Sequence, residues 1–149
     1  MRLGLLRGLV CAWVLACAGV EAARADPTGT WLDKEGGTVR IRTCGGGALC
    51  GTIASVKPRL DPETSRPWTD KKNVDPRLRA RPLVGVQVLI AMQPNGARKW
   101  SGRLYNPNDG KSYSGNLLEL GSGAIRVEGC WLGVCGGENL RRVGTLAAR

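Results

Sequence analysis

The chain has 149 residues and a formal net charge of +10 at pH 7, and 42% of its residues are hydrophobic. This length is enough for one globular domain with a real hydrophobic core. The sequence contains no histidine, which excludes a Ser-His-Asp triad and a Cys-His catalytic pair.

Residues 1–25 have the three parts of a secretory signal peptide. Two arginines lie among the first seven residues, an apolar run follows from 9 to 20, and Ala23-Arg24-Ala25 is a small-x-small cleavage pattern. The apolar run is shorter than the roughly 20 residues that a membrane-spanning helix needs. We therefore expect cleavage after Ala25 and a periplasmic or secreted protein that does not span the membrane. Lipidation at Cys17 is the alternative.

The mature chain would be a single domain over residues 26–149. Cleavage removes three arginines and one glutamate, which lowers the net charge from +10 to +8. Outside the cytoplasm, this positive charge is expected to face anionic lipid, polysaccharide or cell wall. No basic-aromatic motif typical of nucleic-acid binding is present. The simplest interpretation of the charge is a solvated positive surface that aids solubility.

Short apolar stretches separated by turn residues predict about eight β-strands and no convincing helix. Strands joined by short turns are antiparallel, and closing eight of them into a barrel removes every exposed edge. We predict an all-β fold, an antiparallel up-and-down β-barrel, with a two-sheet β-sandwich as the alternative. The expected strands are Gly29–Leu32, Val39–Arg42, Leu49–Val56, Leu83–Met92 (with Val84, Val86, Val88, Ile90 and Met92 on one face), Lys99–Tyr105, Ser112–Leu120, Ala124–Glu128 and Asn139–Gly144.

One segment, from Lys57 to Pro82, interrupts this pattern. It carries five prolines, eight lysines or arginines and four acidic residues. So long a connection is uncommon in a compact domain and is often functional or mobile. If the segment is extended, Arg77, Arg79 and Arg81 lie on one side as a candidate anion-binding row. The alternative is a solvated, partly ordered loop.

Four cysteines remain outside the signal peptide: Cys44, Cys50, Cys130 and Cys135. An exported chain favours disulfides over thiols, and four cysteines allow three pairings. The glycines beside them permit sharp turns, so we predict Cys44–Cys50 and Cys130–Cys135; the crossed pairings stay open. Neither spacing is the C-x-x-C of a redox motif, and zinc would have to be held by cysteines alone. We expect no metal and no cofactor.

Several stretches resemble the bacterial family DUF2147, a secreted domain of unknown function. The most specific is the hairpin Tyr-Asn-Pro-x-Asp-Gly-Lys-x-Tyr at residues 105–113, and the others are 29–31, 41–51, 70–85 and 127–135. The resemblance implies a small exported β-barrel with no known activity, and it carries over no functional residues. The family usually closes with a tryptophan near the place where Leu140 stands here. Gly29-x-Trp31 is also similar to the opening of lipocalins and avidins, in which the tryptophan closes one end of the barrel.

The sequence offers little for catalysis. Four carboxylates of the long segment, Asp61, Glu63, Asp70 and Asp75, include candidates for a glycosidase-like pair, which needs a fixed separation and one raised pKa. A polar, mobile loop supplies neither, so we expect no enzyme and no catalytic residues.

A closed eight-stranded barrel has room for packed side chains or for one small ligand. The candidate ligand-lining residues are Trp31, Trp100, Tyr105 and Tyr113, although each tryptophan, taken singly, is better explained as a core aromatic. We therefore expect a non-enzymatic module that binds a small apolar or amphipathic ligand in the cell envelope. The alternative is a surface module whose basic loop binds an anionic envelope polymer or a partner protein.

Overall fold

The computed structural model describes residues 26–121 and 123–144. The predicted signal peptide, its cleavage after Ala25 and the alternative lipidation site at Cys17 lie outside the described residues. The described chain contains eight strands and one 3-10 turn. Their bounds are β1 Gly29–Leu32, β2 Thr38–Thr43, β3 Leu49–Ser55, η1 Pro76–Leu78, β4 Gln87–Pro94, β5 Lys99–Asn106, β6 Lys111–Gly121, β7 Ala124–Trp131 and β8 Val134–Arg142.

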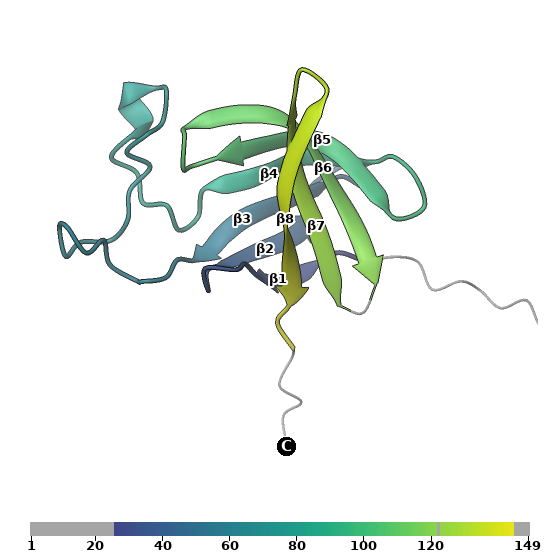
Figure 1. Ribbon diagram of the computed structural model, residues 1–149, viewed down its shortest axis with the longest axis horizontal. Coiled ribbons are helices and arrows are strands. Elements are labelled where there is room, and N and C mark those ends of the chain that lie inside the picture. The colour runs from purple at the N-terminus through teal and green to yellow at the C-terminus, as the bar shows by residue number, and fades with distance from the viewer. Residues whose placement is uncertain (1–25, 122, 145–149) are drawn as a thin grey trace, which may run out of the picture.

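The eight strands close into an antiparallel up-and-down barrel (Figure 1). Each strand pairs with its neighbour in sequence, and β8 returns to β1 with Trp31 opposite Arg142 and Leu32 opposite Arg141. The predicted barrel is confirmed. The alternative sandwich is wrong, because the pairing of the first strand with the last leaves neither sheet edge free.

Inward-facing apolar side chains form the hydrophobic core of the barrel. Alternate residues of a strand point to opposite faces of the sheet, so each strand contributes one inner row. The largest apolar side chains that are less than 2% exposed are Trp31, Ile41, Leu89, Met92, Leu117 and Ile125.

The fourth strand departs from its expected position. Val84 is 51% exposed and β4 begins only at Gln87, because the preceding residues are held in irregular structure. Leu83 donates its N–H to the carbonyl of Trp68, and Gly85 donates to that of Ile53. The prediction that Val84 lies on one face with Val86, Val88, Ile90 and Met92 was therefore wrong.

A bulge also changes which side chains of β4 face the core. Ala91 has a φ of +49°, and the pairing with β5 shifts register between Ile90 and Gln93. Because the extra residue breaks the alternation, Leu89 and Met92 are both almost fully buried. Gly102 on β5 accommodates the bulge, since a Cβ there would lie 2.8 Å from the carbonyl oxygens of Ile90 and Ala91.

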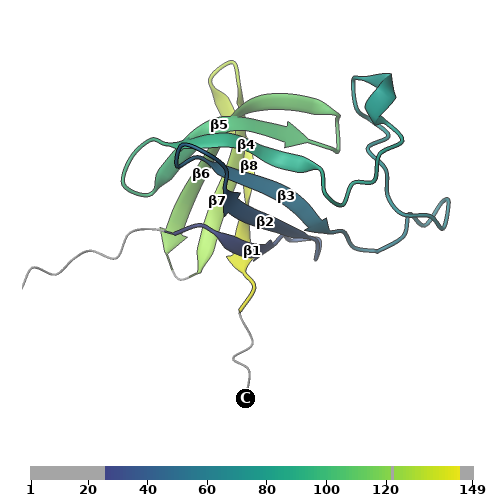
Figure 2. The same ribbon diagram turned by 180° about the vertical axis from the view of Figure 1, so that it is seen from behind.

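The last hairpin is longer than the sequence pattern indicates. β7 runs to Trp131 and β8 starts at Val134, whereas the expected strands ended at Glu128 and resumed at Asn139. The turn residues Leu132 and Gly133 have φ values of +48° and +83°. The hairpin rises beyond the body of the barrel as a separate projection (Figure 1, Figure 2).

The long connection from β3 to β4 is folded against the barrel. Two isolated bridges, Leu60 with Pro67 and Thr69 with Pro82, pair its outgoing and returning halves. In Figures 1 and 2 it extends to one side of the barrel, and η1 reaches the same upper edge of the molecule as the β7–β8 hairpin. Within the described ranges, the chain forms no helix long and apolar enough to cross a membrane.

Candidate functional site

The barrel contains a cavity of about 400 Å³. Its lining includes residues of the β1–β2 turn, the start and end of the β3–β4 connection, the β5–β6 turn and β8 next to its hairpin. These four connections lie at the same end of an up-and-down barrel, so the cavity opens at that end. The opposite end holds the β2–β3, β4–β5 and β6–β7 turns.

The cavity is apolar inside and polar at its mouth. Its deep walls come from the strands, and its exposed rim comes from the turns. The walls include Ile41, Ile53, Leu89, Leu104, Val127 and Leu140, and the rim includes Asp33, Lys34, Glu35, Lys57 and Asn108.

Glu138 is the charged side chain that the barrel wall itself brings to the cavity. It lies on β8 opposite Val127 and is half-buried. Burial, followed by the negative charges of Asp33 and Glu35, raises the pKa of Glu138, while Lys34 acts in the opposite direction. The cavity therefore presents a poorly solvated carboxyl group where apolar wall gives way to polar rim.

The other end of the barrel is closed by Trp31 and Arg142. The Trp31 indole donates its N–H to the carbonyl of Pro27 at 2.8 Å. The guanidinium of Arg142 stacks 4.3 Å from the centre of the Trp31 ring. Its two amino groups donate to the carbonyls of Thr28 and Asp26, both at 2.6 Å. A cation over an aromatic face is attractive, so these contacts fasten the first described residues to the last strand.

A buried carboxylate fastens the long connection to the mouth of the cavity. Asp70 is 1% exposed and accepts a hydrogen bond from the Tyr105 hydroxyl at 2.5 Å. It also accepts from the Asn73 amide at 2.8 Å and from Arg81 Nη2 at 2.8 Å. The Asn73 amide donates as well to the Tyr105 hydroxyl at 2.9 Å. We refer to these four residues as the Asp70 cluster.

The Asp70 cluster has a definite protonation state. Burial by itself raises the pKa of Asp70, but the hydrogen bonds from Tyr105, Asn73 and Arg81 outweigh it and the net pKa is lowered. Burial and the neighbouring carboxylate raise the pKa of Tyr105 to about 12. Asp70 is therefore an anion and Tyr105 a neutral donor at neutral pH, which suits a structural clamp and not a general acid.

Comparison with known proteins adds a family and a fold. The model of the bacterial family described as "Uncharacterized protein conserved in bacteria (DUF2147)" matches residues 29–142. The chain belongs to DUF2147. No curated protein shows significant similarity to it in sequence.

Among solved structures, this DUF2147 protein is similar to protein HP1028 from the human pathogen Helicobacter pylori, which is described as belonging to the lipocalin family. The TM-score is 0.68 at 22% identity, over 81% of this chain and 85% of that one. The expected lipocalin-like barrel is confirmed at the level of the fold.

The DUF2147 barrel places the four candidate ligand-lining residues in different environments. Tyr105 lines the cavity. Trp31 and Trp100 belong to the packed core, and Tyr113 lies by a shallow hollow beside the β7–β8 hairpin, in edge contact with Trp131 at 6.4 Å between ring centres. Of the four, only Tyr105 is in the cavity lining as described, because the other three aromatic rings pack against neighbouring side chains.

The three candidate anion-binding arginines do not form a row in this protein, because the segment is not extended and turns at η1. Arg77 pairs with Asp75 at 2.8 Å. Arg79 donates to the backbone carbonyl of Asn73 at 2.8 Å. Arg81 pairs with Asp70, so each guanidinium has a partner within the loop itself.

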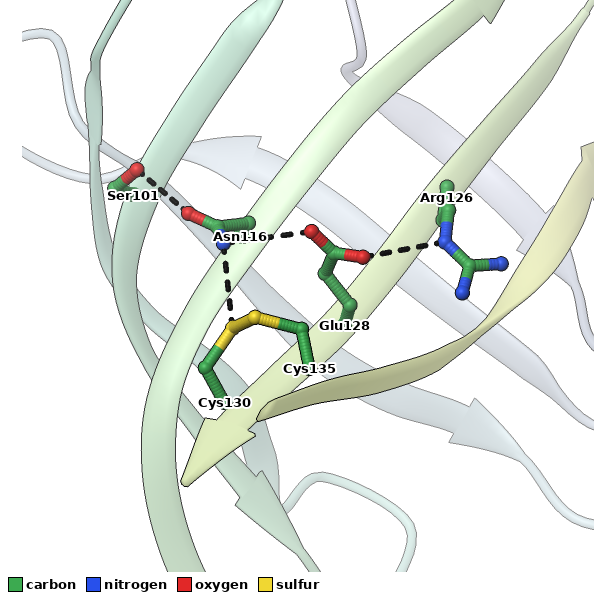
Figure 3. The surroundings of a disulfide bond; sticks show 6 residues. All are labelled: Ser101, Asn116, Arg126, Glu128, Cys130 and Cys135. Atoms are coloured by element: carbon green, nitrogen blue, oxygen red, sulfur yellow. Dashed lines mark hydrogen bonds and ion pairs between the residues drawn. A yellow bond between two sulfur atoms is a disulfide. The ribbon is translucent and has the colours of Figure 1, made fainter. Parts of the chain in front are cut away.

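Both predicted disulfides are present. Cys44 and Cys50 are bonded across the β2–β3 turn, and Cys130 and Cys135 across the β7–β8 hairpin. Figure 3 shows the second one with Asn116, whose amide lies 3.5 Å from Cys130 Sγ and 3.4 Å from a Glu128 oxygen. Glu128, Cys130 and Cys135 bring potential metal-ligand atoms within 4.8 Å of one another. The two sulfurs are bonded to each other, however, and thus provide no thiolate for zinc.

Sequence patterns missed Glu138, the Asp70 cluster and the partner of Trp31. Glu138 follows two glycines, which weaken a strand signal. Asp70 lies in a segment whose composition is that of a solvated loop. Arg142 lies more than 100 residues from Trp31 in sequence, and no local pattern connects them. The Asp-Gly turn that joins β5 to β6 was found, and Gly110 within it packs against the carbonyl of Lys72.

Proposed function

We propose that this DUF2147 protein is a non-enzymatic binding module that takes a small apolar or amphipathic molecule into its barrel, outside the cytoplasm. The observation that carries the proposal is the cavity of about 400 Å³ that opens at one end of the barrel. Small-molecule sites are mostly concave, of roughly 300–1,000 Å³, with apolar walls and few polar groups. The two disulfides are consistent with a protein that folds in an oxidising compartment.

The charges at the mouth limit the polar end of the ligand. Glu138 is half-buried, so its charge is less screened by water than those of the exposed residues around it. An anionic head group placed there would be repelled by Glu138, Asp33 and Glu35. The exposed Lys34 and Lys57 of the rim offset this repulsion only in part, because they are more screened by water. A hydroxyl or ammonium group would instead donate a hydrogen bond to the carboxylate. We propose a neutral or cationic amphiphile as the ligand.

Binding without catalysis agrees with the side chains available. The whole chain has no histidine, and Cys44, Cys50, Cys130 and Cys135 are all oxidised. The most deeply buried carboxylate among the described residues, Asp70, is already engaged by Tyr105, Asn73 and Arg81. A histidine base, a cysteine thiolate and a free Asp70 carboxylate are thus not available, which leaves the Glu138 carboxyl as the group that meets a ligand in the cavity.

The test is displacement of a fluorescent apolar probe from the purified, oxidised protein by a long-chain alcohol, an amine and a fatty acid of equal length. We expect the alcohol and the amine to compete and the fatty acid to fail. Val127→Trp, which fills the cavity, should weaken probe binding by about tenfold or more. Val84→Trp is the matched control, because Val84 is exposed and does not line the cavity.

Two outcomes distinguish the parts of this proposal. Glu138→Gln should admit the fatty acid without weakening the alcohol, because the repelling charge is gone while the cavity remains. Probe binding that Val127→Trp leaves unchanged would overturn the cavity as the site. Native and denatured mass measured on protein recovered after export would then show whether any molecule had been carried along.

The alternative, docking of an anionic polymer on the basic connection, has less support. Arg77 and Arg81 are already paired with carboxylates of the same segment. Polymer binding that falls steeply with added salt, and that does not respond to Val127→Trp, would favour this second function.

A further inference from the structure

The tip of the β7–β8 hairpin exposes three large apolar side chains. Trp131 is 65% exposed, Leu132 is 89% exposed and Val134 is 76% exposed. Together with Gly133 they form a continuous stretch with no charged residue. Apolar side chains gathered at one projecting point are unusual on a soluble surface and mark an interaction site.

The backbone conformation of the turn disfavours a leucine at position 132. Leu132 and Gly133 both have positive φ, +48° and +83°, as two-residue type I′ hairpin turns require. Asn-Gly is the sequence that favours this turn, whereas a bulky residue with positive φ is a rare and strained choice. A leucine at a position whose backbone conformation disfavours it points to a role for its exposed side chain in an interaction.

The tip is also held rigid. The Cys130–Cys135 disulfide links paired positions at the base of the tip. The Tyr113 ring meets Trp131 edge-on at 6.4 Å, and Asn116 contacts Cys130 and Glu128 (Figure 3). A preorganised loop loses little conformational entropy when it binds. The hairpin projects beyond the barrel at the edge that η1 also reaches (Figure 1, Figure 2).

Positive charge flanks this apolar tip. Arg103 lines the shallow hollow beside Trp131 and Leu132. The connection that carries η1 has eight basic and four acidic residues, so it keeps an excess of positive charge even though Arg77 and Arg81 are paired with Asp75 and Asp70. Apolar side chains that enter a bilayer, surrounded by lysine and arginine, are the combination that binds anionic lipid surfaces. Tryptophan in particular prefers the boundary between lipid and water.

We propose that residues 131–134 are a membrane-docking tip, which inserts Trp131, Leu132 and Val134 into the interface of an anionic lipid bilayer. The long connection then faces the lipid head groups. This docking does not depend on a ligand in the barrel, and it can be tested with the cavity empty or filled.

The experiment is co-sedimentation of the purified, oxidised protein, its N-terminus defined by mass, with vesicles of phosphatidylglycerol and phosphatidylethanolamine. Vesicles of phosphatidylcholine alone serve as the uncharged control. Leu132→Asn should reduce partitioning by about tenfold and at the same time raise the unfolding midpoint, because asparagine suits positive φ. Leu120→Asn is the matched control, since Leu120 is 48% exposed and lies on β6 next to the β6–β7 turn, at the opposite end of the barrel from the tip.

A second variant locates the contact. Lipids brominated near the head of the acyl chain should quench tryptophan fluorescence in the native protein. Trp131→Leu should keep partitioning but lose this quenching.

The proposal is overturned if Leu132→Asn and Leu120→Asn partition alike, or if neither the native protein nor its variants bind anionic vesicles. It is also overturned if Leu132→Asn acts by dissociating a dimer in sedimentation velocity, because the tip would then be covered by a second copy of the chain.

Discussion

Asp70 is the residue on which the position of the long connection depends. Its side chain is fully buried, and the partner guanidinium of Arg81 is 38% exposed. Burial of a carboxylate is tolerated only when its oxygens are hydrogen-bonded and its charge is paired. Asp70 meets both conditions through Tyr105, Asn73 and Arg81. The connection between β3 and β4 is therefore part of the folded domain.

Replacing Asp70 by asparagine should destabilise the protein by about 2 kcal/mol, because it removes the charge that pairs with Arg81 and a buried hydrogen-bond acceptor. The folded-state pKa of Asp70 is lowered. The contribution of the Asp70 carboxylate to folding stability is therefore fully present above the unfolded pKa of about 3.9, and it is lost as the pH falls through the folded pKa. Urea unfolding should show the full difference between native protein and Asp70→Asn at pH 7 and a shrinking one below pH 4.

Tyr105→Phe is the control for this prediction. It keeps the Asp70–Arg81 ion pair and removes the hydroxyl, whose pKa is raised to about 12. A group whose pKa is raised by folding contributes to stability below its unfolded pKa, which is about 10 for tyrosine. This contribution is lost as the pH rises through the folded pKa. Tyr105→Phe should therefore alter the alkaline limb of the stability profile. If Asp70→Asn and Tyr105→Phe both left the pH dependence of stability as it is in the native protein, this result would contradict the role of the Asp70 cluster as a clamp.

At the scale of elements, each disulfide closes one hairpin. Cys44 and Cys50 are six positions apart, and Cys130 and Cys135 are five. Short loops of nearly equal length should contribute similarly in the chain-entropy model. The two bonds differ in what they hold, since the first lies beside a glycine turn and the second supports the exposed tip.

Replacing both cysteines of either pair by serine should lower the free energy of unfolding by about 2 kcal/mol. Only the Cys130→Ser and Cys135→Ser double variant should also weaken vesicle binding, because the other disulfide lies on the opposite barrel end. Equilibrium urea unfolding and vesicle co-sedimentation measure the two effects. Equal loss of vesicle binding in both double variants would show that general destabilisation, and not the tip, is responsible.

The strands that the sequence predicts well are those with alternating apolar residues and clear turns. The Asn106–Gly110 turn lies within the β5–β6 connection as expected, and β1 has the predicted bounds. The fourth strand was predicted, but its start at Gln87 and its bulge were not, because the positive φ of Ala91 has no sequence signal in an alanine. The ends of β7 and β8 were missed since Gly129, Gly136 and Gly137 have low strand propensity, which cross-strand pairing overrides.

The same limit applies to the site. Apolar strand residues and a barrel of eight strands allow a cavity to be expected, but whether side chains fill it depends on packing across the barrel. Trp31 and Trp100 are large enough to line a ligand site, yet both lie in the packed part. Glu138 and Asp70 acquire their roles from residues on other strands and loops, so their contacts are nonlocal and leave no motif.

At the scale of the whole molecule, the barrel is closed by the pairing of β1 with β8. This seam is short, with two paired positions on each strand. Arg142 reinforces it by its hydrogen bonds to Thr28 and Asp26 and by its stacking on Trp31. Removal of this one side chain should therefore affect the closure of the entire barrel.

Arg142→Ala should destabilise the protein by about 2 kcal/mol, because it removes two charge-assisted hydrogen bonds and a cation–aromatic contact. Arg141→Ala is the control, since neighbouring strand residues point to opposite faces. Hydrogen exchange should rise in β1 and β8 first for Arg142→Ala. Equal exchange in the two variants would mean that the seam is held by backbone pairing alone.

This seam also bears on how the protein is made. Arg142 lies 114 positions from Thr28 and 116 positions from Asp26 in the sequence. Contacts between residues so far apart form late, because loop closure is costly. In a chain that is synthesised amino end first, β1 is available to fold while β8 is still missing. Until the last strand arrives, the preceding strands form an open sheet whose unpaired edges attract other chains. A translation product cut short before Arg142 would consequently become a client for chaperones and proteases, and not a smaller barrel.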